Sequence, residues 1–375
     1  MPVTFSFPTT IKFGAGSVGE LGETLRSLGA NKPLVVTDAP LTETRAFRTA
    51  VAAISGPFHV FADTRSNPTE DNVEAAARAF VEQQCDSVIG LGGGSAIDVA
   101  KIVRVRVNRP TWNLREPLSG EDDLGALAPF IAIPTTAGTG SEVGRSSVIT
   151  IEGQKRVIFH RALLARLVIL DPELTVELPA KLTAATGADA LTHCIESFTS
   201  PMFHPLCDGI ALEGIHLIAR SLRTTVSIPM NLEARGNMLV AATMGGIAFQ
   251  KDLGAAHSLA HPLSAICGLH HGLANALVLP TVMRFNAMRK PGLYARVGQA
   301  MGTKSADPHT ISAVEDLFKD IGLPRDLATV GVKPDHLPAL VDQAFADACH
   351  QTNPVPVTRE DLHRLYQEAM HRDPW

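Results

Sequence analysis

Hydrophobic positions in the first half of the chain switch between short continuous runs and helical spacing. Lys32 to Asp38 contains the run Leu-Val-Val, which is typical of a strand buried on both faces. Asn72 to Gln84 instead spaces its apolar residues three and four apart, as an amphipathic helix does. Asp86 to Leu91 predicts another strand, a helix follows from Ser95, and further strands are expected at Phe58 to Ala62 and Pro129 to Pro134. Strands that alternate with helices predict a mostly parallel sheet covered on both faces.

The second half of the chain has a different pattern. From Pro179 onward strand-like runs nearly vanish, and long helical patterns rich in Ala and Leu replace them. Asp171-Pro172 and Pro179 interrupt the chain at the change of pattern. We therefore predict an α/β N-terminal nucleotide-binding domain over residues 1–179 and an all-α C-terminal domain over residues 180–375.

Composition narrows the class of protein. Of the 375 residues, 45% are hydrophobic and 19% charged, which is ordinary for a soluble enzyme with a sizeable core. A net charge of −5 provides no basic field for nucleic acid or an anionic membrane, so neither is expected as a partner. Met1 to Thr10 lacks the pattern of a signal peptide, and no apolar run approaches the ~20 residues of a membrane span. The cysteines form no CxxC pair and predict reduced thiols in the cytoplasm: Cys85, Cys194, Cys207, Cys267 and Cys349.

A glycine-rich turn runs from Gly90 to Asp98 between a predicted strand and a predicted helix. Glycines there let the backbone approach a pyrophosphate, and the free amides of the helix start attract its charge. Ser95 and Asp98 also have the spacing of an N-terminal capping pair. Because Ser95 stands where the last glycine of G-x-G-x-x-G belongs, the run suits an ordinary strand-to-helix turn equally well.

Other polar positions after the predicted strands are candidates for cofactor contacts. Asp38, at the end of a strand, could accept hydrogen bonds from an adenosine ribose and repel a 2′-phosphate, which would favour NAD over NADP. The same aspartate could also simply cap a turn or helix. Asn67-Pro68-Thr69 and Pro134 to Glu142 (PTTAGTGSE) are hydroxyl- and glycine-rich turns that could line a cofactor.

Histidines with helical spacing give the second half its most specific signal. Asp189 and His193 are four residues apart on one predicted helix face, and His257 and His261 repeat that spacing. His270-His271 follows, directly before Gly272, where a turn is expected. One carboxylate and several imidazoles can hold a divalent cation and leave a position open for a substrate oxygen, although single helical histidines also occur as core or capping residues. Nitrogen and oxygen ligands suit iron, zinc, cobalt or nickel.

Several of these segments together resemble a known family. GGGSAIDVAK (Gly92 to Lys101), PTTAGTGSE, GADALTHCIE (Gly187 to Glu196), and HSLAHPL followed by HHGLAN (His257 to Asn275) are similar to the signature segments of iron-containing (group III) alcohol dehydrogenases. They occur in the family's order, and the similarity runs from about residue 13 to residue 286. The resemblance implies a dehydroquinate-synthase-like architecture, with a Rossmann-like NAD domain followed by a helical metal domain.

The resemblance also implies roles for particular residues. It implies metal ligation by Asp189, His193, His257 and His271, with Fe²⁺ as the expected ion and Zn²⁺ as the alternative. His261 matches a nearby histidine that does not bind the metal and would relay a proton or position the nicotinamide. The positions that match cofactor contacts, together with the two turn residues Asn67 and Thr136, are Asp38, Asn67, Gly93, Gly94, Ser95, Asp98, Thr135, Thr136, Thr139 and Lys155.

The implied activity is that of an oxidoreductase. A Lewis-acid metal would polarise the oxygen of an alcohol or aldehyde, and NAD would exchange hydride with the carbon. AFQK, CDGIAL and CHQTNP make the chain look closest to the 4-hydroxybutyrate dehydrogenase-like branch, whose substrate is an ω-hydroxy acid. A cation for the substrate carboxylate would come from Arg145, Lys251 or His270, and Ser146 would widen the pocket. Family habit predicts a homodimer or a larger homo-oligomer.

Three alternatives remain at this point. The chain could be a broad-range primary alcohol or aldehyde dehydrogenase, although Ile247 to Asp252 departs from the pattern of simple-alcohol members. It could be a maleylacetate reductase, although that branch often lacks the full metal set. A metal-dependent lyase of the dehydroquinate synthase type would also bind NAD and a metal, but would give no net reduction of NAD with any alcohol.

Overall fold

The structure is a computed structural model that describes residues 7, 9–116, 118 and 122–371. Contacts between Cα atoms divide the chain into two compact units. We call the first, Met1–Thr136 with Gly140–Leu178, the α/β unit. The second, Ala137–Thr139 with Pro179–Trp375, is the helical unit. Each is described by itself.

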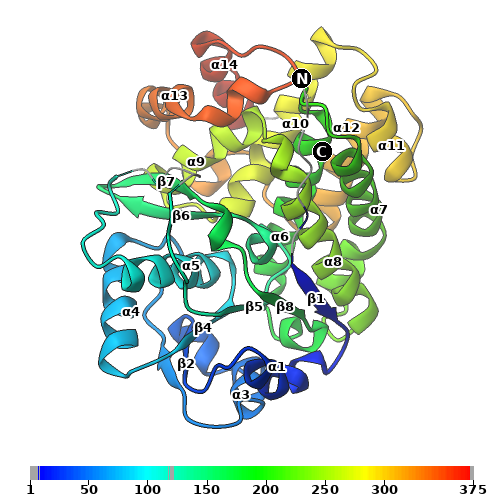
Figure 1. The fold of residues 1–375 in the computed structure, drawn as a ribbon. Helices are drawn as coiled ribbons and strands as arrows, with labels where there is room; N and C mark the ends of the chain where they lie inside the picture. The colour runs from blue at the N-terminus through cyan, green and yellow to red at the C-terminus, as the bar shows by residue number, and fades with distance from the viewer. Residues whose placement is uncertain (1–6, 8, 117, 119–121, 372–375) are drawn as a thin grey trace. The chain divides into compact units, whose positions relative to one another are not determined.

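A six-stranded, fully parallel sheet forms the centre of the α/β unit, in the order β1-β8-β5-β4-β2-β3 (Figure 1). The expected parallel sheet is confirmed, and four of its strands lie where the hydrophobic runs predict them. Two strands, β1 and β8, were not predicted. The strands are β1 (Thr10–Phe13), β2 (Pro33–Val36), β3 (His59–Phe61), β4 (Ser87–Gly92), β5 (Phe130–Pro134) and β8 (Leu167–Leu170).

Successive side chains of a strand point to opposite faces of the sheet, and helices cover both of these faces. Ile89 and Leu91 of β4 pack into the core that includes residues of α1 and α3. Gly90, between them, faces α5, where a Cβ would lie 3.1 Å from both the Cα of Ile97 and the Cβ of Ala100. The missing side chain thus lets α5 pack closely on β4. The helices are α1 (Leu21–Ser27), α2 (Ala39–Thr42), α3 (Arg45–Ala52), α4 (Glu70–Glu82) and α5 (Gly94–Asn108), with the 3₁₀ turns η1 (Ser17–Glu20), η2 (Ser141–Val143), η3 (Arg161–Leu163) and η4 (Pro172–Thr175).

The start of α5 differs from the predicted capping pair. The helix begins at Gly94 with Gly93 as its N-cap, so Ser95 occupies the second helical position, where its hydroxyl does not cap the helix. That hydroxyl donates to the carbonyl oxygen of Ser66 at 2.7 Å. The N-cap residue Gly93 supplies no side-chain hydrogen bond to the first turn of α5. The capping prediction is therefore wrong.

An antiparallel hairpin, β6 (Ser146–Ile151) and β7 (Gln154–Phe159), completes the α/β unit and was also not predicted. Its two-residue turn is Glu152-Gly153, with φ angles of 51° and 77°. Positive φ at both central residues is what a tight hairpin turn requires. The hairpin carries Lys155, one of the predicted cofactor contacts.

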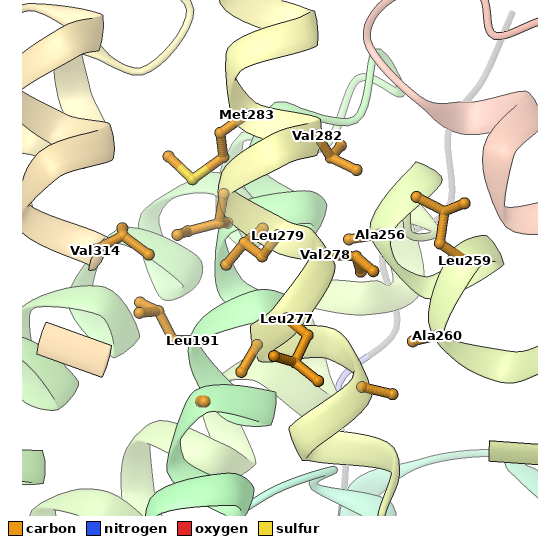
Figure 2. Close-up of a cluster of buried hydrophobic side chains, with 14 of the residues drawn as sticks. Leu191, Ala256, Leu259, Ala260, Leu277, Val278, Leu279, Val282, Met283 and Val314 are labelled. Atoms are coloured by element: carbon orange, nitrogen blue, oxygen red, sulfur yellow. The ribbon is translucent and has the colours of Figure 1, made fainter. Parts of the chain in front are cut away.

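The helical unit has its own hydrophobic core, and the predicted all-helical character is confirmed. α10 is buried along most of its length, from Gly272 to Met283 apart from partly buried Leu273, as expected for a helix enclosed by others. Figure 2 shows it passing between α9, with Ala256 and Leu259, and a side formed by Leu191 of α6 and Val314 of α12. No helix among the described residues is both long and apolar enough to cross a bilayer. The elements are α6 (Ala180–Thr199), α7 (Pro205–Ser227), α8 (Leu232–Ala248), η5 (Phe249–Lys251), α9 (Ala255–Cys267), α10 (His271–Arg289), α11 (Ala295–Ala300), α12 (Asp307–Asp320), η6 (Ala328–Val330), η7 (Pro334–His336), α13 (Leu337–Ala346), η8 (Ala348–Thr352) and α14 (Arg359–Met370).

Candidate metal centre and cofactor turns

The four predicted metal ligands come together inside the helical unit. α6 supplies Asp189 and His193, α9 supplies His257, and His271 is the first residue of α10. Donor atoms of Asp189, His257 and His271 lie within 4.8 Å of one another. The Nε2 atoms of His193 and His257 are 3.1 Å apart. α6 and the consecutive helices α9 and α10 thus bring one carboxylate and three imidazoles together.

Glycines allow the helices that carry these ligands to pack closely. A Cβ on Gly272 would lie 2.2 Å from the carbonyl oxygen of Ala185, so the first turn of α10 fits against α6 only with glycine there. A Cβ on Gly245 of α8 would lie 3.2 Å from the Cβ of His193. Because His271 directly precedes Gly272, close packing of the helix start sets the position of this ligand.

Hydrogen bonds define which ring nitrogens face the centre. Nδ1 of His257 bonds a carboxylate oxygen of Glu196 at 2.6 Å, and Nδ1 of His193 bonds the main-chain carbonyl oxygen of Asp189 at 2.8 Å. Both partners are acceptors, so both Nδ1 atoms donate and a lone pair remains on each Nε2 of the neutral rings. Burial lowers the pKa of His193 to about 4, so that ring is neutral at pH 7.

The donor set therefore fits a divalent cation. Two lone pairs facing each other at 3.1 Å repel unless a positive charge lies between or beside them. His193, His257 and Asp189 are each no more than 3% exposed, so water does not relieve that repulsion. Imidazole nitrogens and a carboxylate are ligands that iron and zinc accept.

Asn275 is a further member of this cluster that was not predicted. Its Nδ2 donates to Asp189 at 2.8 Å and lies 3.2 and 3.3 Å from Nε2 of His257 and of His271. Its Oδ1 is buried and accepts no hydrogen bond from any residue that the structure describes. The position of Asn275 four residues after His271 was the available signal, since this spacing places both on one helix face.

Glu196, also not predicted, organises the start of α9. Besides Nδ1 of His257, its carboxylate accepts the backbone N–H groups of Gly254, Ala256 and His257 at 3.0, 2.7 and 3.3 Å. Gly254 is the N-cap of α9, so a carboxylate from α6 caps this helix in place of a local side chain. Glu196 lies three residues after His193, on the same face of α6.

His261 lies one turn beyond His257 and beside the cluster. Its ring stacks on His271 with centroids 5.2 Å apart and planes inclined by 15°. Its Nδ1 bonds a carboxylate oxygen of Asp347 at 2.7 Å. The side chain is 20% exposed, unlike the enclosed His257. The structure thus places a solvent-accessible imidazole next to the candidate ligands.

The predicted substrate contacts have different outcomes. Lys251 is 2% exposed, and its ammonium pairs with Asp208 and donates to the carbonyl oxygen of Phe198 at 3.2 Å. Because Asp208 already neutralises it, Lys251 is engaged as a buried cation, and its geometry does not support the predicted role with a substrate carboxylate. His270 is exposed at the N-cap of α10. Arg145, in the α/β unit, is half-buried with its guanidinium 5.7 Å above the ring of Phe159.

In the α/β unit the predicted cofactor residues gather where three neighbouring strands end. Asp38 follows β2, and its Oδ2 lies 3.7 Å from where a Cβ on Gly92 would stand. The N–H of Thr135, after β5, donates to the carbonyl oxygen of Gly92 at 3.0 Å. Thr136 would touch a Cβ on Gly93 at 3.5 Å. Carboxyl ends of neighbouring parallel strands are where nucleotides bind in such sheets.

The surroundings of this edge also fit a nucleotide. Ser95 hydrogen-bonds the residue before Asn67, which brings that turn to the uncapped start of α5 at Gly94. Asp38 itself caps α2 by accepting the N–H of Leu41 at 3.0 Å, so the capping interpretation of this residue is confirmed. A cavity of about 610 Å³ opens beside it, lined by residues that include Ala39, Pro40, Thr64, Arg65 and Asn72.

Two predicted cofactor contacts are engaged elsewhere. Asp98 is 8% exposed and accepts the hydroxyl of Ser141 at 2.5 Å and the N–H of Val148 at 2.9 Å. Its two oxygens connect α5 to η2 and β6 by hydrogen bonds, so direct contact of this carboxylate with a cofactor is not supported. Thr139 belongs to the helical unit, where its hydroxyl donates to Asp189 at 3.1 Å. Ser146 lies at the start of β6, and its carbonyl oxygen accepts a hydrogen bond from the ammonium group of buried Lys101 at 2.6 Å.

Comparison with known proteins identifies the family. The profile described as "Iron-containing alcohol dehydrogenase" matches residues 8–172, and "Fe-containing alcohol dehydrogenase family, C-terminal" matches residues 183–370. The chain belongs to the iron-containing alcohol dehydrogenase family. It is an alcohol oxidoreductase, and the predicted resemblance is confirmed.

This alcohol dehydrogenase is similar to known relatives both in sequence and in fold. A 4-hydroxybutyrate dehydrogenase from Cupriavidus necator is 39% identical over 377 residues, covering 96% of this chain and 98% of the relative. A sulfoacetaldehyde reductase from Bifidobacterium kashiwanohense, solved in complex with NAD⁺, has a TM-score of 0.90 at 30% identity, with both chains fully covered. An iron-containing alcohol dehydrogenase from Thermococcus thioreducens has a TM-score of 0.90 at 28% identity, covering 99% of this chain and 100% of that one.

Proposed function

We propose that this dehydrogenase transfers hydride between NAD and a primary alcohol group, with 4-hydroxybutyrate or a similar ω-hydroxy acid as its substrate. The observation that carries the proposal is the convergence of Asp189, His193, His257 and His271, of which the first three are buried. These four residues would hold Fe²⁺, with Zn²⁺ as an alternative ion. Similarity to the Cupriavidus 4-hydroxybutyrate dehydrogenase supports the choice of substrate class.

Residues of the helical unit would prepare the substrate for this reaction. When bound, the metal supplies Lewis-acid polarisation of the substrate oxygen, and the nicotinamide accepts the hydride. Asn275 holds the Asp189 carboxylate in place. The apolar helices around the cluster exclude bulk water, which strengthens the electrostatic contacts there. His261 accepts the hydroxyl proton because its partly exposed ring lies beside the candidate ligands.

The cofactor would bind at the strand ends of the α/β unit. The uncapped start of α5 at Gly93 and Gly94 offers backbone N–H groups to a pyrophosphate. Thr135 and Thr136 line the same edge, and Ser95, Asn67 and Lys155 complete the proposed contacts. Asp38 would accept the ribose hydroxyls and repel a 2′-phosphate, which selects NAD.

The substrate carboxylate requires a cationic partner, and Lys251 is the weakest of the three candidates because it is buried and pairs with Asp208. Arg145 and exposed His270 are the proposed partners of the carboxylate, with Ser146 beside Arg145. A guanidinium is the stronger candidate, since it can bind a carboxylate through two parallel hydrogen bonds.

Comparing two substrates tests this proposal. NADH formation is measured with Fe²⁺-loaded enzyme, without oxygen, on 4-hydroxybutyrate and on 1-butanol, which share their chain length and differ chiefly in the carboxylate. A kcat/KM ratio of roughly a hundredfold in favour of the acid, about 2.7 kcal/mol at the transition state, is expected. Arg145→Gln should remove most of that preference, whereas Arg48→Gln, an exposed arginine of α3, should keep it.

A broad-range primary alcohol dehydrogenase is the second candidate function. The neutralised Lys251 favours it, because one of three predicted carboxylate partners is already engaged. Equal kcat/KM values for the two substrates, or a preference for butanol, would support this function and remove the carboxylate site.

Cellular setting and assembly are part of the same proposal. Five cysteines form no disulfide bond, which supports a reducing compartment such as the cytoplasm: Cys85, Cys194, Cys207, Cys267 and Cys349.

β1 is an edge strand on which Phe13 is 55% exposed, a feature that favours association of two or more copies. Light scattering on the purified protein tests the assembly: a mass of one chain at micromolar concentration would contradict it.

A further inference from the structure

Two histidines one turn apart on α9 share the same arrangement of partners. Nδ1 of His257 bonds Glu196 at 2.6 Å, and Nδ1 of His261 bonds Asp347 at 2.7 Å. Each carboxylate comes from a segment outside α9. The two histidines differ in what their Nε2 atoms face. Nε2 of His257 lies against His193, whereas no described residue hydrogen-bonds Nε2 of His261.

Asp347 is held firmly in this position. One of its oxygens, Oδ1, accepts the hydroxyl of Ser258 and the N–H of Cys349, both at 2.8 Å. The oxygen of Ser258 accepts in turn the N–H of His350 at 2.7 Å. The carboxylate therefore cannot turn away from His261 without breaking contacts with both α9 and η8. Partial burial alone would raise the pKa of Asp347, but these donors and His261 hold it below its usual range.

The state of His261 follows from this arrangement. An ionised carboxylate only accepts, so Nδ1 of His261 must carry a proton. The lone pair of the neutral ring is then on Nε2, the nitrogen to which no described residue donates a hydrogen bond. Stacking on His271 fixes the plane of the ring beside the candidate metal ligands.

We propose that Asp347 is a positioning residue that keeps His261 in the Nδ1–H form, so that Nε2 accepts the substrate proton. The inference rests on the proposed function. In alcohol oxidation the C–H electron pair leaves as hydride to NAD⁺, and the O–H electron pair becomes the second C–O bond. The released proton moves to Nε2, and Asp347 stays ionised and stabilises the resulting imidazolium.

Asp347→Asn tests the proposal with little change of shape. Because Ser258 and the N–H of Cys349 both require an acceptor, the amide oxygen replaces Oδ1 and the NH₂ group faces Nδ1 of His261. The ring must then accept at Nδ1 and carry its proton on Nε2, which blocks proton uptake. With the holoenzyme we expect kcat to fall about a hundredfold, while KM for the alcohol, bound metal and Tm stay near wild type. Asp342→Asn, an exposed position on α13, is the matched control and should keep kcat.

A double-mutant cycle with His261→Gln separates positioning from a general structural role. If Asp347 acts only through His261, adding Asp347→Asn to His261→Gln should lower kcat by less than about twofold. Multiplicative losses would overturn the proposal, as would an unchanged kcat in Asp347→Asn alone.

The tautomer is measured directly by ¹⁵N NMR of the Zn²⁺-loaded protein labelled at histidine, with His261→Gln identifying the signals. Wild type should show Nδ1–H and Asp347→Asn should show Nε2–H. The Nε2–H form in wild type would overturn the inference. This readout needs no turnover, so failure of the proposed substrate to react would leave it interpretable.

Discussion

Glu196 binds one imidazole and three backbone N–H groups, and its removal has a predictable effect on metal binding. Glu196→Gln keeps the length of the side chain but loses the charge that stabilises the Nδ1–H form of His257 and the start of α9. We expect the affinity for Fe²⁺ or Zn²⁺ to fall about 10- to 100-fold, measured by competition with a chelator. Glu213→Gln, on the exposed face of α7, should bind metal as wild type does. Equal affinity in the two variants would show that Glu196 does not support the site.

Asp38 offers a second test because its two roles can be separated. Asparagine also accepts the N–H of Leu41, so Asp38→Asn preserves the cap of α2 and removes only the charge. The ratio of kcat/KM for NADP⁺ to that for NAD⁺ should rise at least about tenfold, or ~1.4 kcal/mol, through loss of repulsion. Glu43→Gln, at the other end of α2, serves as the control. An unchanged ratio would place the 2′-hydroxyl of the cofactor away from Asp38.

The roles of single residues were predictable where two functional side chains lie four residues apart on one helix. Asp189 and His193, or His257 and His261, can be paired from sequence because a four-residue interval places side chains on one face. Asp347 contacts His261 across 86 positions, and Asp208 neutralises Lys251 across 43, and no local pattern encodes either contact. For that reason the sequence predicted Lys251 as a substrate cation and did not predict Asp347.

At the scale of elements, the start of α10 can be tested with two glycines. Gly272→Ala puts a methyl group 2.2 Å from the carbonyl oxygen of Ala185, so α10 must move and take His271 with it. We expect a loss of about 1–3 kcal/mol of folding stability in the apo protein, together with weaker metal binding. Gly209→Ala, at an exposed site of α7 with no atom near the new methyl, should instead stabilise by about 0.5–1 kcal/mol. Chemical denaturation of both variants provides the comparison, and equal effects would contradict this account of packing.

Helices and strands were predictable where the hydrophobic pattern is continuous. Strands at the edges of the sheet were harder to predict. β2, β4 and β5 coincide with short continuous apolar runs, and α4 coincides with an amphipathic helical pattern. β1 is a four-residue edge strand with exposed ends, so it lacks the continuous run of a buried strand. β8 has such a run, Leu-Val-Ile-Leu, so the signal for this strand is present in the sequence. The capping error at Ser95 arose because the helix starts one residue before that serine.

At the scale of the whole molecule, metal and nucleotide should stabilise different units. The ligands of the proposed metal lie on α6, α9 and α10, whereas the nucleotide contacts follow β2, β4 and β5. Hydrogen exchange should therefore slow in α6, α9 and α10 when Fe²⁺ is added to the apo protein, because binding stabilises the folded state. NAD⁺ should slow exchange around Gly92–Gly94 and Thr135–Thr136 instead. Slowing by Fe²⁺ confined to the α/β unit would contradict the assignment of the metal site.

The class of fold was predictable from the change of pattern near Pro179, because a parallel sheet and a helical bundle require different hydrophobic spacing. The family motifs then indicated which histidines form one metal site, which residue spacing alone did not determine. The three residues Ala137–Thr139, which belong to the helical unit although they follow β5, had no such signal.

The most direct test of the central claim is an anaerobic titration of the apo protein with Fe²⁺, followed by NADH formation on 4-hydroxybutyrate or 1-butanol, whichever reacts faster. If Asp189, His193, His257 and His271 form the metal centre, activity should rise from near zero and level off at one ion per chain. His257→Ala should abolish that rise. Full activity without metal, or a rise that His257→Ala leaves unchanged, would contradict the claim.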